Sequence, residues 1–198
     1  MNGSAQAIKA TLRQRLCAVA RQHTPAEQAT ASQAICARLR EQPVWQRARR
    51  IAAFWPMPGE PDLRPIYREA LAERKELALP RFLPDLHRYI ICRIEDDVLD
   101  VCRGHFGITE PLASCQPVEL KKLDFWLVPG VGFALDGGRL GRGKGYYDQM
   151  LSEAQGFKCG VAFEWQLTAE VPAESHDIIL DCILTPARWA EVASVRRL

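Results

Sequence analysis

The sequence lacks the features of a membrane-bound or secreted protein. No apolar run approaches the ~20 residues of a membrane-spanning helix, and even a strongly apolar stretch such as 125–128 is short. Lys9, Arg13 and Arg21 interrupt the N-terminal segment, which is therefore unlike the apolar core of a signal peptide. We therefore expect a cytoplasmic protein with no membrane partner.

The cysteine pattern does not indicate a set of disulfide bonds or a metal site. There are 7 of them, an odd number, their spacings are wide, and no C-x-x-C pair occurs. This pattern argues against a disulfide scaffold or a zinc knuckle and favours reduced thiols in a cytosol. Cys92, Cys159 and Cys182 lie in apolar runs, where we expect them to pack as small core residues.

The sequence also has no large excess of positive or negative charge. The 26 Lys and Arg residues nearly balance the 24 Asp and Glu residues, so the formal net charge is only +2. Such a balance gives no general attraction for a polyanion, and we expect no nucleic-acid partner. The 198 residues, 47% hydrophobic and 25% charged, are typical of a globular chain. We predict a single domain over residues 1–198.

The first 42 residues carry two helical patterns, the second of which is predicted to end at about Glu41. Apolar residues at helical spacing predict a helix over 8–20, and Thr24 followed by Pro25 and Glu27 resembles a capping box that starts a second helix. Further helices are predicted over 63–74 and 146–154.

Strand-like apolar runs alternate with these helices, and residues 84–120 are predicted to form a hairpin or loop insertion. Continuous apolar runs are typical of parallel strands that are buried on both faces. The predicted fold class is therefore α/β, a three-layer sandwich with a mostly parallel central sheet flanked by helices. The predicted strands are 50–55, 77–80, 88–94, 123–129, 156–163 and 178–184.

A glycine-rich loop joins the strand at 123–129 to the helix that starts at residue 146. Its segment Gly138–Gly145 approaches a P-loop, except that Gly145 stands where a P-loop has Ser or Thr. Glycines let backbone N–H groups approach an anion, and the helix N-terminus adds positive potential. The loop therefore predicts phosphate or polyphosphate binding, with a solvated surface loop as the alternative. Its basic residues are Arg139, Arg142 and Lys144.

Asp148 lies one turn into the helix that follows this loop. A carboxylate there can hold the Mg²⁺ ion that the missing Ser or Thr would hold in a P-loop. Compensation of the helix dipole is the alternative interpretation of this residue.

The same loop resembles the signature of the 5-formyltetrahydrofolate cyclo-ligases, also called methenyltetrahydrofolate synthetases. The matching elements are Pro129–Phe133, Gly138–Gly141 and Gly143–Asp148. The resemblance extends along nearly the whole chain, with departures at Trp55, Met57 and Pro58, where members vary. The further landmarks are Lys9-x-x-Leu12-Arg13, Gly59–Asp62, Phe106–Pro111 and His176-Asp177-x-x-x-Asp181.

This resemblance implies an ATP-dependent and Mg²⁺-dependent reaction. The family converts 5-formyltetrahydrofolate to 5,10-methenyltetrahydrofolate and releases ADP and phosphate. Phosphorylation turns the formyl oxygen into a leaving group, and N10 of the folate then closes the ring. The implied partners are 5-formyltetrahydrofolate and ATP, and we expect the protein to act as a monomer.

The resemblance also implies which residues perform each task. Arg142 and Lys144 are the expected catalytic residues, because phosphoryl transfer depends on neutralising charge. Folate is expected to contact Trp55, Glu60 and Tyr146, and Mg²⁺ to contact Asp148 and Asp181. The residues expected to bind ATP are Lys9, Arg13, Arg139, Leu140, Gly141, Arg142, Gly143, Lys144, Gly145, Tyr146 and Tyr147.

Taken without the resemblance, several of these residues have plainer interpretations. Lys9 and Arg13 fit a solvated helix face, Trp55 fits the core, Glu60 fits a turn and Asp181 fits a salt bridge. Two other functions stay open at this point. One is a small-molecule kinase that uses the loop for ATP, although no kinase signature set is present. The other is a nucleic-acid-binding module that uses surfaces such as 47–50.

Overall fold

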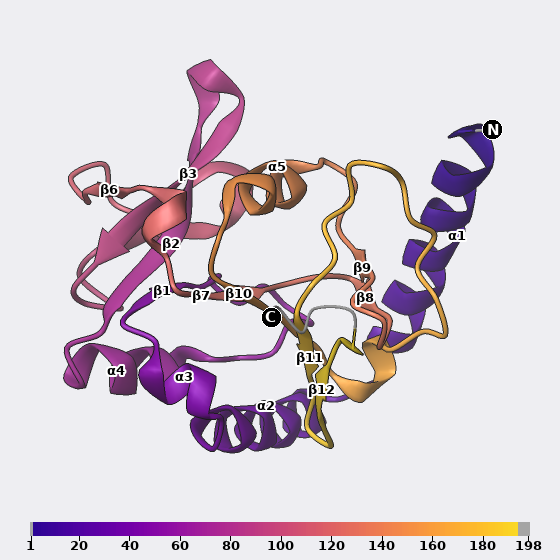
Figure 1. Cartoon of the computed structure of the whole chain (residues 1–198), viewed down its shortest axis with the longest axis horizontal. Coiled ribbons are helices and arrows are strands. Elements are labelled where there is room, and N and C mark those ends of the chain that lie inside the picture. Colours follow the sequence, from indigo (N-terminus) through magenta and orange to yellow (C-terminus); the bar gives the residue numbers. More distant parts are fainter. Residues whose placement is uncertain (1, 194–198) are drawn as a thin grey trace.

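One eight-stranded sheet forms the centre of the molecule in the computed structural model, which describes residues 2–193 (Figure 1). The strand order is β12-β11-β10-β7-β1-β2-β3-β6, with parallel pairing from β11 to β2 and antiparallel pairing at both edges. The strands are β1 (Arg50–Ala52), β2 (Glu76–Leu83), β3 (Arg88–Ile94), β6 (Pro117–Val118), β7 (Phe125–Val128), β10 (Phe157–Val161), β11 (Cys182–Leu184) and β12 (Trp189–Glu191).

Helices cover both faces of this sheet. One face carries α2 (Pro25–Arg40), α3 (Pro43–Arg47) and α4 (Arg64–Ala72), and the opposite face carries α5 (Tyr146–Glu153) (Figure 1). Helix α1 (Asn2–Ala20) stands to one side of the sheet. The predicted three-layer α/β sandwich with a mostly parallel sheet is confirmed.

The core alternates between the two faces along each strand. In β1, Ile51 packs in the cluster with α2, α3 and α4, whereas Ala52 packs in the cluster with α5. In β7, Leu127 faces the first cluster and Trp126 the second. Both faces are apolar, and this explains the continuous apolar runs in the sequence.

Most of the predicted elements are present, but three strands were predicted with the wrong length. The strand predicted over 50–55 ends at Ala52, and the one predicted over 77–80 extends over Glu76–Leu83. The Thr24 side chain caps α2 and forms the complete capping box with Glu27. The predicted strand at 178–184 is too long, because only 182–184 join the sheet. Leu180 instead donates its N–H to Gly137, which draws this part of the chain away from the sheet.

The region 84–120 forms hairpins and short turns, as predicted. Strand β3 runs antiparallel to β2, and a separate two-stranded ribbon pairs β4 (Val101–Arg103) with β5 (Thr109–Pro111). The short 3-10 helices of this region are η1 (Pro84–Leu86), η2 (His105–Gly107) and η3 (Leu120–Lys122).

A second small ribbon lies between β7 and α5, where the sequence predicted only a loop. It pairs β8 (Gly132–Phe133) with β9 (Arg139–Leu140), and it packs on Leu12 and Leu16 of α1. A Cβ atom on Gly132 would approach the side chain of Leu16 to 2.3 Å, so any larger residue here would force Leu16 to shift. The ribbon therefore fixes α1 beside the glycine-rich loop. The 3-10 helix η4 (Glu164–Gln166) also contacts α1.

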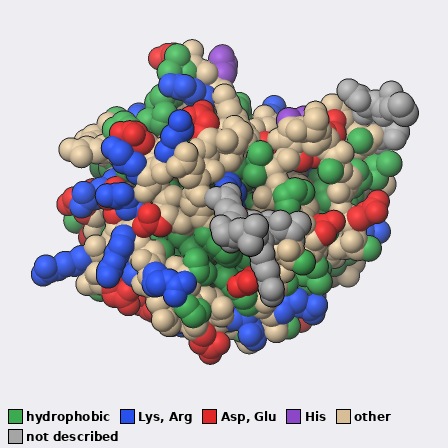
Figure 2. All heavy atoms as spheres, viewed as in Figure 1, with side chains coloured by type: hydrophobic (Ala, Val, Ile, Leu, Met, Phe, Trp, Pro, Cys, Tyr) green, Lys and Arg blue, Asp and Glu red, His purple; other side chains and the backbone are tan. Residues whose placement is uncertain are grey.

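The surface carries charges of both signs. Figure 2 shows basic side chains gathered toward the side of α3, α4 and β3, with acidic side chains among them. No helix in the described range 2–193 has the length and apolar content to cross a membrane. All seven cysteines are free thiols, and Cys92, Cys159 and Cys182 are buried as predicted.

Candidate active site

A cavity of about 810 Å³ opens where the parallel strands β1 and β7 end. Ligands in open α/β sheets bind outside the carboxyl ends of the strands, so this is the expected position for a site. The walls come from six parts of the chain. They are α1, the loop after β1, residues 129–130 after β7, the segment from β9 to α5, the segment 174–177, and the strands and hairpin between Pro80 and Glu110.

The cavity collects nearly all residues that the sequence analysis singled out. Every residue expected to bind ATP or folate lines it, and so does Asp148. Asp181 does not line it. The Asp181 carboxylate is buried elsewhere, at the start of β11, and accepts the backbone N–H of Lys158 at 2.7 Å. The structure therefore does not bring Asp148 and Asp181 together in the cavity.

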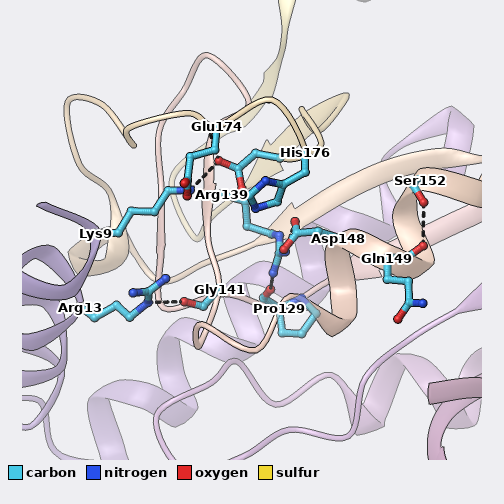
Figure 3. A network of polar contacts seen from close by, with 11 residues as sticks. Lys9, Arg13, Pro129, Arg139, Gly141, Asp148, Gln149, Ser152, Glu174 and His176 are labelled. Carbon is cyan, nitrogen blue, oxygen red and sulfur yellow. Dashed lines mark hydrogen bonds and ion pairs between the residues drawn. The ribbon is translucent and has the colours of Figure 1, made fainter. Parts of the chain in front are cut away.

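The glycine-rich loop has the backbone that its sequence requires. Gly143 and Gly145 have φ angles of 95° and 71°, in the left-handed region that favours glycine. Gly145 is also the N-cap of α5, so the positive end of that helix points toward the cavity. Arg13 of α1 donates its Nε–H to the Gly141 carbonyl at 2.7 Å, which ties the loop to α1 (Figure 3).

Arg139 is paired with Asp148 across the start of α5. Its Nη2 lies 2.6 Å from the Asp148 carboxylate, and its Nη1 donates to the Pro129 carbonyl at 3.3 Å (Figure 3). The Arg139 side chain is only 4% exposed, and its guanidinium lies 5.6 Å from the centre of the Tyr147 ring. Arg139 thus holds Asp148 at the edge of the cavity.

Lys9 is paired with two acids that the sequence analysis did not assign to the site. Its Nζ lies 2.8 Å from Glu174 and 2.6 Å from Asp177. Burial alone would lower the pKa of Lys9, but the hydrogen bonds to Asp177 and Glu174 outweigh it and raise the pKa. The pKa of Asp177 is lowered by Lys9 and by the Glu174 N–H, against the effect of burial. The triad joins α1 to the segment 174–177.

Arg142 is paired with Glu60 from the opposite wall. Its Nη2 lies 2.9 Å from the carboxylate of Glu60, whose other oxygen accepts the Met57 N–H at 3.0 Å. Burial raises the pKa of Glu60, and Arg142 offsets part of that rise.

Lys144 differs from the other basic residues of the cavity. Within residues 2–193, it makes no hydrogen bond or ion pair, whereas Lys9, Arg13, Arg139 and Arg142 all do. Its exposed side chain lies between Gly143 and Gly145 on the cavity wall. Lys144 is therefore the free cation of the described loop.

The cavity also has an aromatic wall, which Tyr146 joins at the end of the glycine-rich loop. The Tyr146 ring lies 5.2 Å from Tyr89 and 5.6 Å from Phe82, and Phe106 from the hairpin lies 5.3 Å from Phe82. Trp55 also lines the cavity, and its ring lies 5.9 Å from the Arg64 guanidinium. This wall can pack against a planar ligand.

Glu110 is a further residue that sequence reasoning assigned no role. It lines the aromatic wall and is buried, and its Oε1 has no hydrogen-bond partner within the described residues. Burial raises the pKa of its carboxyl group. Tyr89 was also missed, because a tyrosine inside a strand gives no local sign that it faces a cavity.

The described residues contain no group of three or more His, Cys, Asp or Glu side chains that could hold a metal ion. Asp148 and Asp177 are nevertheless on the cavity wall. Mg²⁺ commonly takes one or two carboxylates together with phosphate oxygens of a bound nucleotide. The donor set therefore fits Mg²⁺ only in company with such a ligand.

Known proteins of one family resemble the chain over most of its length. The model of the 5-formyltetrahydrofolate cyclo-ligase family matches residues 5–186. The 5-formyltetrahydrofolate cyclo-ligase of Mus musculus is 26% identical over 93% of this chain and 94% of its own length. That of Escherichia coli K12 is 29% identical over 83% of this chain and 93% of its own length.

Solved structures agree with these sequence relatives. The NMR structure of the Aquifex aeolicus 5,10-methenyltetrahydrofolate synthetase superposes with a TM-score of 0.85. It is 32% identical and covers 96% of both chains. A synthetase from Mycoplasma pneumoniae, 24% identical, has the same fold with a TM-score of 0.73 over 90% of this chain and 98% of its own.

Proposed function

Since the chain belongs to the 5-formyltetrahydrofolate cyclo-ligase family, its activity is the ATP-dependent cyclisation of 5-formyltetrahydrofolate, and we propose that the cavity at the ends of β1 and β7 is its active site. The observation that carries the assignment is the convergence of distant segments. Helix α1, the loop after β1 and the glycine-rich loop meet at one cavity, and each brings residues that the family resemblance implies.

The nucleotide half of the site is the segment from Leu140 to Tyr147. Its glycines leave backbone N–H groups accessible to phosphate oxygens, and the N-terminus of α5 adds favourable potential. Lys144 is free to meet the γ-phosphate, and Arg142 is the second catalytic cation. Lys9 and Arg13 approach the phosphates from α1, and Arg139 acts by holding Asp148.

The folate half of the site is the aromatic wall together with Glu60. A carboxylate can accept hydrogen bonds from the two N–H groups at the guanidine-like edge of a pterin. Trp55 and Tyr146 pack against the rings of the folate, and Tyr89 and Phe106 extend the same wall.

Asp148 is the proposed metal ligand, with Asp177 as the second carboxylate on the cavity wall. Bound Mg²⁺ would neutralise charge on the ATP phosphates. Asp181 is left out of this set, because its carboxylate is engaged by the Lys158 N–H outside the cavity.

The protein residues serve the chemistry chiefly through charge and position. The formyl oxygen attacks the γ-phosphorus and ADP leaves, while Arg142 and Lys144 stabilise the negative charge on the transferred phosphoryl group. N10 then attacks the activated carbon and loses its proton, and the C–O bond breaks so that phosphate leaves with the bonding electrons. Packing on the aromatic wall keeps N5 and N10 close enough to close the ring.

One chain brings together all the residues that the family resemblance implies for ATP and folate. We propose that the protein acts as a monomer. Free thiols at all seven cysteines support a cytoplasmic location.

Replacing Glu60 with glutamine is expected to weaken the binding of 5-formyltetrahydrofolate by about 1.5–3 kcal/mol, which corresponds to roughly 10-fold to 150-fold. The charged acceptor is lost, whereas the shape of the side chain is kept. Isothermal calorimetry measures the affinity directly. The matched control is Glu69→Gln, which breaks the exposed ion pair with Arg40. Unchanged folate affinity in Glu60→Gln would place Glu60 outside the folate site.

A further inference from the structure

The ion pair between Arg142 and Glu60 connects the two halves of the proposed active site. Glu60 belongs to the loop after β1, and Arg142 belongs to the segment between β9 and α5, 82 residues away. Their side chains meet at 2.9 Å across the cavity. The group proposed to bind the pterin thus holds a group proposed to bind phosphate.

The two partners differ in burial. The Glu60 side chain is 7% exposed and is fixed by the Met57 N–H, whereas the Arg142 side chain is 52% exposed. Arg142 can therefore turn away without disturbing the core, but Glu60 cannot follow it. Burial raises the pKa of the Glu60 carboxyl and Arg142 offsets part of that rise, so the ion pair stabilises the ionised carboxylate.

The pterin edge of a folate offers a replacement for that partner. Its amino group and ring N–H donate in parallel, in the pattern that a guanidinium presents to a carboxylate. A folate seated on the aromatic wall would therefore satisfy Glu60 as Arg142 leaves. ATP has no parallel pair of N–H donors, and its phosphates are anions like Glu60, so they cannot take the place of Arg142 on that carboxylate.

We propose that the Arg142–Glu60 ion pair is a latch, which folate opens by taking the place of Arg142 on Glu60 and which thereby frees Arg142 for the phosphates of ATP. The latch rests on the proposed function, in which Glu60 binds the pterin and Arg142 binds phosphate. Through this latch, Arg142 contacts the ATP phosphates only when the folate that accepts the phosphoryl group is bound.

A latch of this kind couples the two binding sites. Folate must tighten nucleotide binding, and the nucleotide must tighten folate binding by the same factor, because binding linkage is reciprocal. Coupling between sites is typically about 5-fold to 150-fold. We expect the wild-type protein to show a factor of about five or more.

The experiment measures calorimetric affinity for a non-hydrolysable ATP analogue in Mg²⁺ buffer, with and without saturating 5-formyltetrahydrofolate. In the wild-type protein, folate should raise the affinity for the analogue about fivefold or more. Glu60→Gln removes the carboxylate that holds Arg142. Its affinity for the analogue without folate should therefore be about equal to the affinity of the wild-type protein with folate. In Arg142→Gln, folate should leave the affinity for the analogue unchanged.

Glu69→Gln, with a broken surface pair, is the matched control and should keep the wild-type coupling. Arg142→Gln changes a half-exposed side chain and tests the latch even where Glu60→Gln is poorly folded. Wild-type coupling that survives in Arg142→Gln would overturn the latch. Binding of both ligands to wild type without coupling would overturn the latch alone, whereas binding of neither ligand would overturn the proposed function as well.

Discussion

Arg139→Met is expected to destabilise the protein by about 3 kcal/mol or more, because it removes one partner of a buried ion pair. Arg139 is 4% exposed, and its loss leaves the Asp148 carboxylate, itself 19% exposed, without its cation. Methionine fills much of the space of the arginine stem, so the change tests charge more than packing. Denaturant unfolding monitored by circular dichroism measures the free energy of unfolding.

Two further variants isolate the ion pair as the cause. The double variant Arg139→Met, Asp148→Asn should recover part of the loss, since no unpaired carboxylate remains. Arg40→Met breaks the exposed pair with Glu69 and should change the unfolding free energy by less than about 1 kcal/mol. Equal destabilisation by Arg139→Met and Arg40→Met would contradict the structural role given to Arg139.

Lys144→Met is expected to lower kcat by roughly 100-fold or more, because in the proposed site it removes a cation that stabilises the charge developing on the transferred phosphoryl group. The protein should fold as before, since the exposed Lys144 side chain makes no polar contact within residues 2–193. Steady-state kinetics with ATP and folate varied separately measure kcat and KM.

The split between the two constants identifies the step at which Lys144 acts. A fall in kcat indicates stabilisation of the transition state, whereas a rise in the KM for ATP alone indicates only docking of the nucleotide. Lys122→Met is the matched control on a surface lysine that pairs with Glu119. Unchanged kcat and KM in Lys144→Met would show that Lys144 has no role in catalysis or in binding ATP.

The glycine-rich loop was predictable because its signal is local. The residues that shape its backbone, Gly143 and Gly145, are adjacent in sequence to the charges that it displays. The layered fold was predictable for a similar reason, because burial on both faces of β1 and β7 leaves continuous apolar runs. Local patterns of this kind are read directly from the chain.

The partners of the site residues were not predictable, because they depend on the tertiary fold. Lys9 and Asp177 are 168 residues apart, and nothing near either one indicates the ion pair. Asp177 and Asp181 lie in one short motif, and only the fold decides that Asp177 faces the cavity while Asp181 accepts the Lys158 N–H. The strand expected at 178–184 was too long because Leu180 bonds to Gly137 instead of a sheet neighbour.

The most direct test of the central claim is the absorbance of 5,10-methenyltetrahydrofolate formed by the purified protein. The full reaction contains 5-formyltetrahydrofolate, ATP and Mg²⁺, and each component is omitted in turn. We expect the product only in the full reaction, with one phosphate released for each ring closed. Full product formation without ATP would contradict the assignment of the cavity as the active site of an ATP-dependent cyclo-ligase.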